Sequence, residues 1–246
     1  MKVEYLYKMD RIAKKARTRE PEDVLAYMGY IFMDPGTSVD GFIMRRKGTT
    51  YYGVNQNISG LKYDFCVMHE GFHGLCRHYE VPGFLSSGGA HADTGICGNY
   101  KIVVETERDA NIGAADFILD TQMTLDMLGY DCADVAAYRS DLESFEHHAA
   151  EYQRHLDLVR SMDSSKARLR RMLAYQQELA RMYEELQEQA RDIANSGLCL
   201  TKNEIAREFG VPEYIVDYKF EALELRNFDI PNIELPSFTT VFSNWN

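Results

Sequence analysis

The segment Val67–His78, VMHEGFHGLCRH, determines how the rest of the chain is interpreted, because it contains the pattern His-Glu-x-x-His. On a helix, positions four apart differ by only about 40° in direction, so the imidazoles of His69 and His73 can point at one ion. Glu70 lies about 100° from His69, within reach of a water molecule on that ion. Two imidazoles suit Zn²⁺, and a catalytic zinc site keeps one coordination position open. The pattern therefore predicts a zinc site in which Glu70 takes a proton from the water as it attacks a carbonyl.

A third ligand to such an ion must come from elsewhere in the chain. His78 lies five residues beyond His73, which on a continuous helix turns it by about 140° onto another face, so we expect a helix-end or surface role for it. The segment VVETERDANIGAADFILD opens a second predicted helix with several acids. The spacing of its apolar residues places Glu107 and Asn111 on one face of the helix, with Asn111 as a polar neighbour of the ligand. It gives Glu107 a small preference over Glu105 as the third ligand. The alternative is an acidic helix start that faces solvent.

The composition restricts the classes of protein to consider. The 246 residues carry 27 basic and 38 acidic side chains, a net charge of −11, which argues against nonspecific nucleic-acid binding by the whole molecule. No apolar run approaches the roughly 18–20 residues that span a bilayer, and the charged N-terminus does not resemble a signal peptide. We therefore expect a cytoplasmic protein that does not bind membranes.

The five cysteines form no Cys-x-x-Cys pair, so neither a zinc ribbon nor a thioredoxin-like motif is indicated. Cys66 and Cys76 flank the His-rich segment, and we interpret them as buried free thiols rather than ligands. The metal ligands are therefore expected among the histidines and acids.

The pattern of apolar and turn residues predicts three segments. Residues 1–130 form the predicted core, an α+β fold with two N-terminal helices, a short strand, a strand–turn–strand unit, the helix of the opening motif at about 63–79 and a last helix interrupted near Asp120. A Gly- and Ser-rich loop at 81–100, which contains His91, precedes this last helix and is long enough to border a site.

Residues 131–197 form the second predicted segment, a helical insertion. Apolar side chains recur with steps of three and four over 134–195, in two helices of similar length joined by SMDSS. This heptad-like pattern predicts an antiparallel helical hairpin, capable of self-association, with Gln189 as one polar position in its seam. Two ordinary helices of a bundle are the alternative, because both arrangements have the same periodicity.

Residues 198–246 form the third predicted segment, two short helices followed by an extended tail, with Pro212 in the first turn of the second helix. A helix that reads DNA meets the phosphates with positive charge, but residues 213–226 carry four acids against two basic side chains. We therefore expect this helix-turn-helix-like pair to pack on the core, and we do not expect direct nucleic-acid binding.

Several of these segments resemble the ImmA/IrrE family of metallo-endopeptidases. The resemblance rests on Thr18-Arg19-Glu20-Pro21, on HEGFH, and on Glu107-Arg-Asp-Ala-Asn111 followed by Ala114-Ala115; in addition, IAREFGVPEYIVDYKF is similar to the family's helix-turn-helix-like segment. The likeness covers about residues 10–130 and 200–230. It implies a zincin-like core of helices with a small sheet, with His69, His73 and Glu107 as zinc ligands and Glu70 as the base.

The resemblance also implies a function, because members of that family cleave a cognate transcriptional repressor, often in mobile elements or prophages. A zinc-dependent endopeptidase with such a protein substrate is the expectation. The long loop at 81–100 and the insertion at 134–195 depart from the family, and both concern the substrate rather than the metal. His91 is a candidate for substrate or oxyanion contact, or else a solvent-exposed loop histidine. Three other functions stay open: a DNA-binding regulator, a docking module with a structural metal, and a hydrolase of a small amide.

Overall fold

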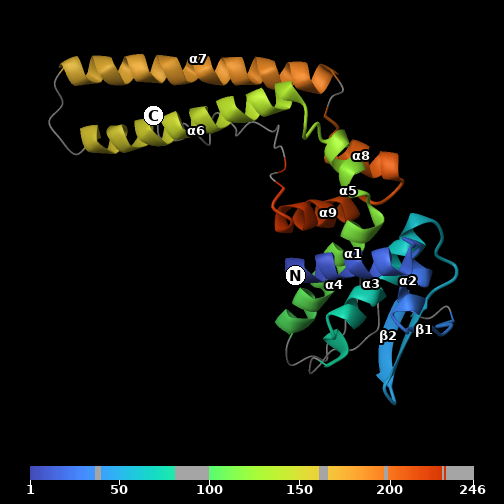
Figure 1. Ribbon diagram of the computed structural model, residues 1–246. Coiled ribbons are helices and arrows are strands. Elements are labelled where there is room, and N and C mark those ends of the chain that lie inside the picture. The colour runs from blue at the N-terminus through green and yellow to red at the C-terminus, as the bar shows by residue number, and fades with distance from the viewer. Residues whose placement is uncertain (37–39, 81–99, 161–165, 197–198, 229, 231–246) are drawn as a thin grey trace. The chain divides into compact units, whose positions relative to one another are not determined.

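The computed structural model describes residues 1–36, 40–80, 100–160, 166–196, 199–228 and 230 (Figure 1). These residues form an α+β fold of mostly helices with one small sheet, as predicted. They divide into two compact units. The first contains Met1–Thr124 and the helix pair that begins at Lys202; the second contains Leu125–Thr201. Within the described ranges, no helix is long and apolar enough to cross a membrane.

Two N-terminal helices begin the first unit, as predicted. α1, Val3–Ala16, buries apolar side chains at steps of three and four: Leu6, Met9 and Ala13. It ends where Arg17 adopts the left-handed conformation, with φ 60°. α2, Pro21–Tyr27, begins with proline followed by two acids, which suit the positive end of the helix dipole.

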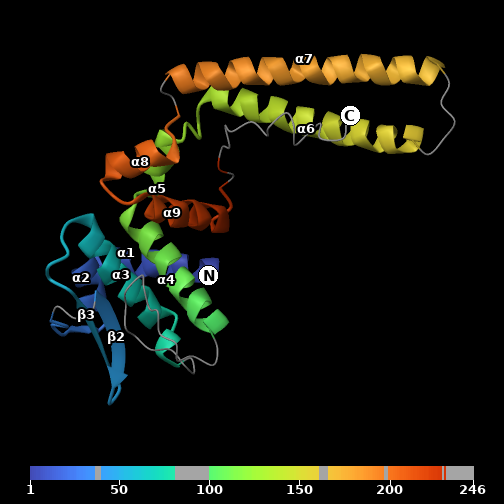
Figure 2. The ribbon, with the colours of Figure 1, turned by 180° about the vertical axis from the view of Figure 1, so that it is seen from behind.

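The sheet has three strands in the order β1–β3–β2: β1 is Ile31–Phe32, β2 is Gly41–Arg46 and β3 is Thr49–Val54. β2 and β3 form the predicted antiparallel hairpin, whereas β1 pairs with β3 in parallel. Lys47 and Gly48 between them both have positive φ, 51° and 83°, as in the tight turns whose twist matches that of the strands. Figure 2 shows the sheet beside α3, Leu61–Leu75, and β2 lies at one edge of the sheet.

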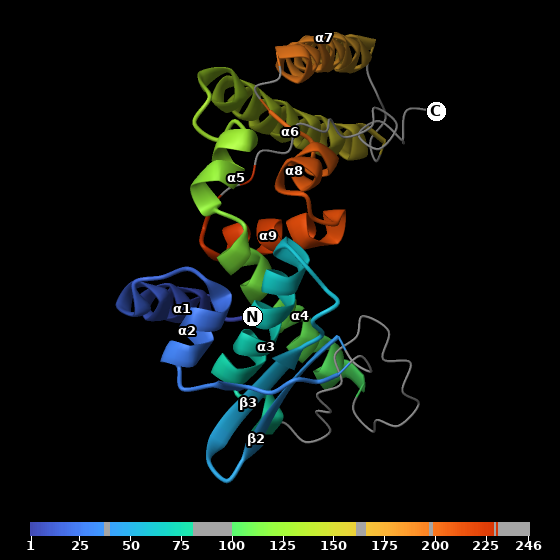
Figure 3. The ribbon, with the colours of Figure 1, turned by 90° about the vertical axis from the view of Figure 1, so that its right-hand side faces the viewer.

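α3 and α4, Tyr100–Ile118, pack side by side in the first unit (Figure 3). They approach closely because Gly113 lies against Phe72; a Cβ atom at this glycine would lie 2.3 Å from the ring. α3 ends short of the predicted end at 79, because Arg77 is left-handed, with φ 58°, and a 3-10 helix, His78–Glu80, follows. α4 ends before Asp120, and α5, Thr121–Met127, begins there, so the predicted interruption is confirmed.

The C-terminal pair consists of α8, Lys202–Phe209, and α9, Glu213–Leu225, and α9 packs along α4. The side chains that α9 buries are mostly apolar: Ile215, Val216, Ala222 and Leu223. Lys219 of the same helix is fully buried, and its Nζ donates to Asp116 Oδ1 at 3.1 Å and to Thr121 Oγ1 at 2.8 Å. Arg226, just beyond the helix, donates to the same Asp116 carboxylate and, at 2.8 Å, to Asp10. Apolar burial and an ion network thus both hold α9 on the core.

The second unit contains the predicted helical hairpin of α6, Ala133–Arg160, and α7, Lys166–Ser196. Its buried core includes residues of the predicted seam: Tyr138, Phe145, Tyr152, Leu179, Leu186 and Ile193. Tyr152 stacks on Tyr175 with ring centroids 5.8 Å apart, and Gln189 Nε2 donates to Asp141 at 2.8 Å, so the helices run antiparallel. Self-association through this hairpin stays a prediction.

Candidate metal centre

α3 and α4 bring together three residues that the sequence proposes as metal ligands. The Nε2 atoms of His69 and His73 are 3.0 Å apart, and the Glu107 carboxylate lies 3.2 Å from the first and 3.4 Å from the second. Ligand atoms of these residues all lie within 4.8 Å of one another. Glu105, the other acid considered, is exposed and lies outside the group. The described residues therefore include one set of side chains able to hold a metal ion.

The separations are close to those between neighbouring ligand atoms of one zinc ion. Zinc binds imidazole nitrogen and carboxylate oxygen at about 2.0–2.1 Å, so two ligand atoms on a tetrahedral ion lie about 3.3 Å apart. The two Nε2 atoms are 3.0 Å apart, His69 Nε2 lies 3.2 Å from Glu107 Oε2, and His73 Nε2 lies 3.4 Å from Oε1 of the same carboxylate, so each contact is close to that distance. Atoms that bring lone pairs so close repel one another unless a proton or a cation lies between them. The donor set therefore suits a divalent cation.

The contact that Nδ1 of each imidazole makes determines whether its Nε2 can bind a metal ion. Asn111 Oδ1 lies 2.9 Å from His69 Nδ1, and an amide oxygen only accepts, so this Nδ1 carries a proton and the Nε2 lone pair of the neutral ring is available. His73 Nδ1 lies 2.8 Å from His78 Nδ1, and donation from His73 has the same effect on its own Nε2. Partners of this kind orient metal-binding imidazoles and raise their basicity.

Glu70 lies beside the ligand group without joining it. It is only 4% exposed, and burial raises the pKa of its carboxyl to about 7, with the nearby Glu107 carboxylate adding to the rise and His69 opposing it. Gly41, at the start of β2, faces it: a Cβ atom there would lie 2.7 Å from Glu70 Oε1. Glu70 is therefore an acid–base group poised near neutral pH between a helix and an edge strand.

The ligand residues also perturb one another. Burial lowers the pKa of His73 to about 4, so this ring is neutral at pH 7. Burial alone would raise the pKa of Glu107, but its contacts with the imidazoles of His69 and His73 lower it by more, which keeps the carboxylate ionised. For His69, burial lowers the pKa, and the hydrogen bond to Glu107 with the charge of Glu70 raises it by more. A cation bound at Nε2 would take the place of the proton that this raised pKa favours.

His78 lies just beyond the end of α3 and outside the ligand group, as expected, but it is buried rather than at the surface. It is 6% exposed and in contact with His73. The expected rotation of 140° assumed a continuous helix, whereas α3 ends at Leu75 and the left-handed Arg77 turns the chain back. His78 is therefore a partner of a ligand. The sequence carries no signal for this, because arginine has no preference for positive φ.

Two other predictions concern residues near the site. His91 lies outside the described residues, so its role stays a prediction. Cys66 and Cys76 are partly buried free thiols and do not belong to the ligand group. Burial raises their pKa values to about 11 and 12, so both are protonated at neutral pH.

Comparisons with known proteins identify no relative of this chain. It matches no family model, no curated protein and no solved structure. The chemistry of the site is therefore argued from its own residues and distances.

Proposed function

We propose that the protein is a zinc-dependent endopeptidase of the ImmA/IrrE type with a zincin-like core. One observation carries the proposal: His69 and His73 from α3 and Glu107 from α4 converge within 4.8 Å, with Glu70 buried beside them. Structural zinc usually has four protein ligands, whereas catalytic zinc has three and an open position. The described residues offer three ligands, which favours a catalytic metal over a docking module with a structural metal.

Each side chain has a distinct task in this mechanism. His69 and His73 would hold the ion through Nε2, and Glu107 through its carboxylate. Bound zinc supplies a Lewis acid that polarises a carbonyl and lowers the pKa of water to about 7. Glu70, buried beside the ligands, would accept the proton of the attacking water and then donate it to the amine nitrogen as the C–N bond breaks.

The neighbouring sheet favours a peptide over a small amide as the substrate. β2 is an edge strand, and its first residue, Gly41, lies against Glu70. An edge strand offers backbone donors and acceptors that an extended peptide can pair with. We propose a protein substrate, and the family resemblance points to a transcriptional repressor of a mobile element or prophage.

Metal analysis of the purified full chain tests the first half of the mechanism. The wild-type protein is expected to bind one zinc ion, and His73→Ala and Glu107→Ala are expected to lose it, because each removes one of the three proposed ligands. Glu70→Gln should keep the zinc, since this side chain is not a ligand. Metal bound equally well by Glu107→Ala would contradict the ligand assignment.

Cleavage of a proteome-derived peptide library tests the second half. The zinc-loaded wild type is expected to generate new termini, detected by mass spectrometry, and Glu70→Gln is the matched control that retains the metal. Loss of a general base costs about 10²–10⁴ in rate, so the new termini should nearly disappear. If Glu70→Gln cleaved as fast as the wild type, the assigned mechanism would be wrong.

A further inference from the structure

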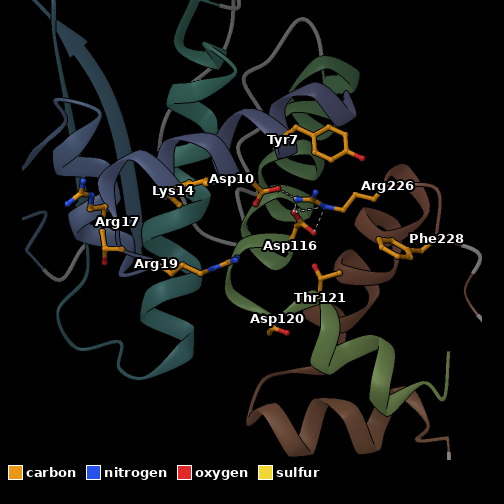
Figure 4. A pocket seen from close by; sticks show the side chains of 12 residues that line it. Tyr7, Asp10, Lys14, Arg17, Arg19, Asp116, Asp120, Thr121, Arg226 and Phe228 are labelled. Carbon is orange, nitrogen blue, oxygen red and sulfur yellow. Dashed lines mark hydrogen bonds and ion pairs between the residues drawn. The ribbon is translucent and has the colours of Figure 1, made fainter. Parts of the chain in front are cut away.

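A cavity lies away from the metal centre (Figure 4). It is lined by α1, the segment after it, the end of α4 and the residues after α9. Its volume of about 760 Å³ falls within the range of roughly 300–1,000 Å³ typical of small-molecule sites. The three ligand residues and Glu70 are not part of its lining. The cavity is therefore distinct from the proposed catalytic site.

The floor of this cavity is an ion network that is neutral as a whole. Arg226 donates to both oxygens of Asp116 and to Asp10. Behind it, the buried Lys219 donates to Asp116 and Thr121. Two cations and two carboxylates thus satisfy one another and form a fixed, polar base that adds no net charge to the cavity.

One end of the cavity carries surplus positive charge. Lys14, Arg17 and Arg19 line it and are exposed, and within the described part of the chain none of them forms an ion pair. Arg19 donates one N–H to the backbone oxygen of Phe117 and keeps its other donors. The one further acid in the lining, Asp120, accepts from a backbone N–H at the start of α5.

This positive charge is a local feature in an acidic protein. The first 19 residues carry seven basic and two acidic side chains, although the chain as a whole has a net charge of −11. Unpaired guanidinium and ammonium groups at the wall of a cavity favour an anion, and phosphate is the group that best matches several of them at once.

The other end of the cavity is aromatic. Figure 4 shows Tyr7 and Phe228 there, separated from Arg17 and Lys14 at the opposite end. Tyr7 is 45% exposed, and the Arg226 guanidinium lies over its ring at 5.0 Å from the centroid. The exposed ring of Tyr7 suits the planar ring of a ligand.

We propose that this cavity binds an organic phosphate of nucleoside monophosphate size. The phosphate lies among Lys14, Arg17 and Arg19, and the planar base lies at the exposed ring of Tyr7. Between these ends, the partly exposed carboxylate of Asp10 accepts hydrogen bonds from the sugar hydroxyls. The proposal goes beyond the peptidase function and does not depend on it.

Calorimetric titration of the full chain with AMP, GMP, CMP and UMP tests the proposal. At least one of the four is expected to bind saturably, and its nucleoside and inorganic phosphate should each bind at least about tenfold more weakly, because each fills only one end. Lys14→Gln combined with Arg17→Asn should weaken binding by about tenfold or more. Asn accepts the positive φ of residue 17, so this variant keeps the local backbone.

The matched control is Lys8→Gln with Arg11→Gln, which removes two exposed charges from the same helix outside the cavity lining and should change affinity less than about twofold. If the two double variants lost affinity equally, the nucleotide would be attracted by the overall positive charge of this surface rather than by the residues of the cavity, and the proposal would be overturned. No saturable binding of any of the four nucleotides at millimolar concentration would overturn it as well. So would salt-dependent binding of a DNA duplex without binding of a mononucleotide, which would indicate a nucleic-acid surface instead.

Discussion

His69 and His73 each use both nitrogen atoms of the ring, one toward the proposed metal position and one toward a neutral partner. The partners differ in kind, since Asn111 comes from α4 and His78 from the turn after α3. Each outer contact restricts both the rotation of its ring and the position of its proton. Metal affinity should therefore depend on two residues that do not touch the metal.

His78→Ala is expected to weaken zinc binding by about 10–100-fold, the usual cost of losing the outer partner of a histidine ligand. His73 would lose its 2.8 Å contact and with it the preference for presenting Nε2. Competition against a calibrated chelator measures the affinity. His147→Ala on α6 removes an exposed histidine of the second unit and is the control that should leave affinity unchanged. Equal affinities for His78→Ala and the wild type would show that the contact does not position the ligand.

Cys66 and Cys76 should resist alkylation in the native protein. A thiol with a pKa of 9.0 is half ionised at pH 9, whereas one with a pKa of about 11 is ionised about fifty-fold less. Iodoacetamide labelling at pH 9, followed by mass spectrometry, should thus be at least that much slower than in denaturant. Because the unfolded chain loses these protons first, the free energy of unfolding should fall as the pH rises from 9 toward 11 and 12. Equally fast labelling of native and unfolded protein would contradict the burial of both thiols.

At the scale of elements, the ligand geometry depends on how closely α3 and α4 pack. Glu107 of α4 reaches two imidazoles of α3 because α4 has no side chain at Gly113 that would hold it away from Phe72 of α3. The position is sensitive to one added carbon, since a Cβ atom there would overlap the ring. A substitution at a residue that is not a ligand can thus act on the metal site.

Gly113→Ala should destabilise the first unit by about 1–3 kcal/mol, the cost of overpacking a tight contact, and should also weaken zinc binding. Denaturant titration measures the first effect and chelator competition the second. Phe72→Leu introduced together with Gly113→Ala removes the overlapping ring and should restore part of both. If Gly113→Ala alone were as stable as the wild type, the helices would have more room than this contact indicates.

Much of this arrangement could be predicted because it follows from local spacing. The i, i+4 relation of His69 and His73 fixes a common direction on any helix, and the seam of α6 and α7 follows from steps of three and four. The phase of α4 narrowed the third ligand to Glu107 or Glu105 but could not decide between them, because that depends on the packing of α4 against α3. The position of His78 could not be predicted, since it depends on one left-handed residue, Arg77.

At the scale of the whole molecule, the chain forms two compact units, and the proposed metal ligands belong to the first alone. Binding to a folded unit stabilises that unit and leaves an independent one unchanged. The hairpin unit has its own apolar core, which includes Tyr138, Phe145 and Leu186. The two units should therefore respond differently to the metal.

Removal of zinc by a chelator should lower the melting temperature of the first unit only. At a free zinc concentration a thousand times the dissociation constant, binding contributes about 4 kcal/mol. Calorimetry should resolve one transition that moves with zinc and one, from the α6–α7 hairpin, that does not. In Glu107→Ala, zinc should change the melting temperature of neither transition. A shift of both transitions together in the wild type would show that the units unfold as one.

α4 joins the two regions to which function is assigned. Glu107 and Asp116 are nine residues apart on it, about 13.5 Å along the axis of a helix that does not bend easily. If a ligand in the cavity shifted Asp116 along the helix axis, Glu107 would shift by nearly the same distance. Binding of the nucleotide and binding of the metal would then be thermodynamically linked. Such linkage is reciprocal: whatever factor the nucleotide contributes to metal affinity, the metal must return to the nucleotide. The activity of the proposed hydrolase would then depend on the concentration of a metabolite in the cell.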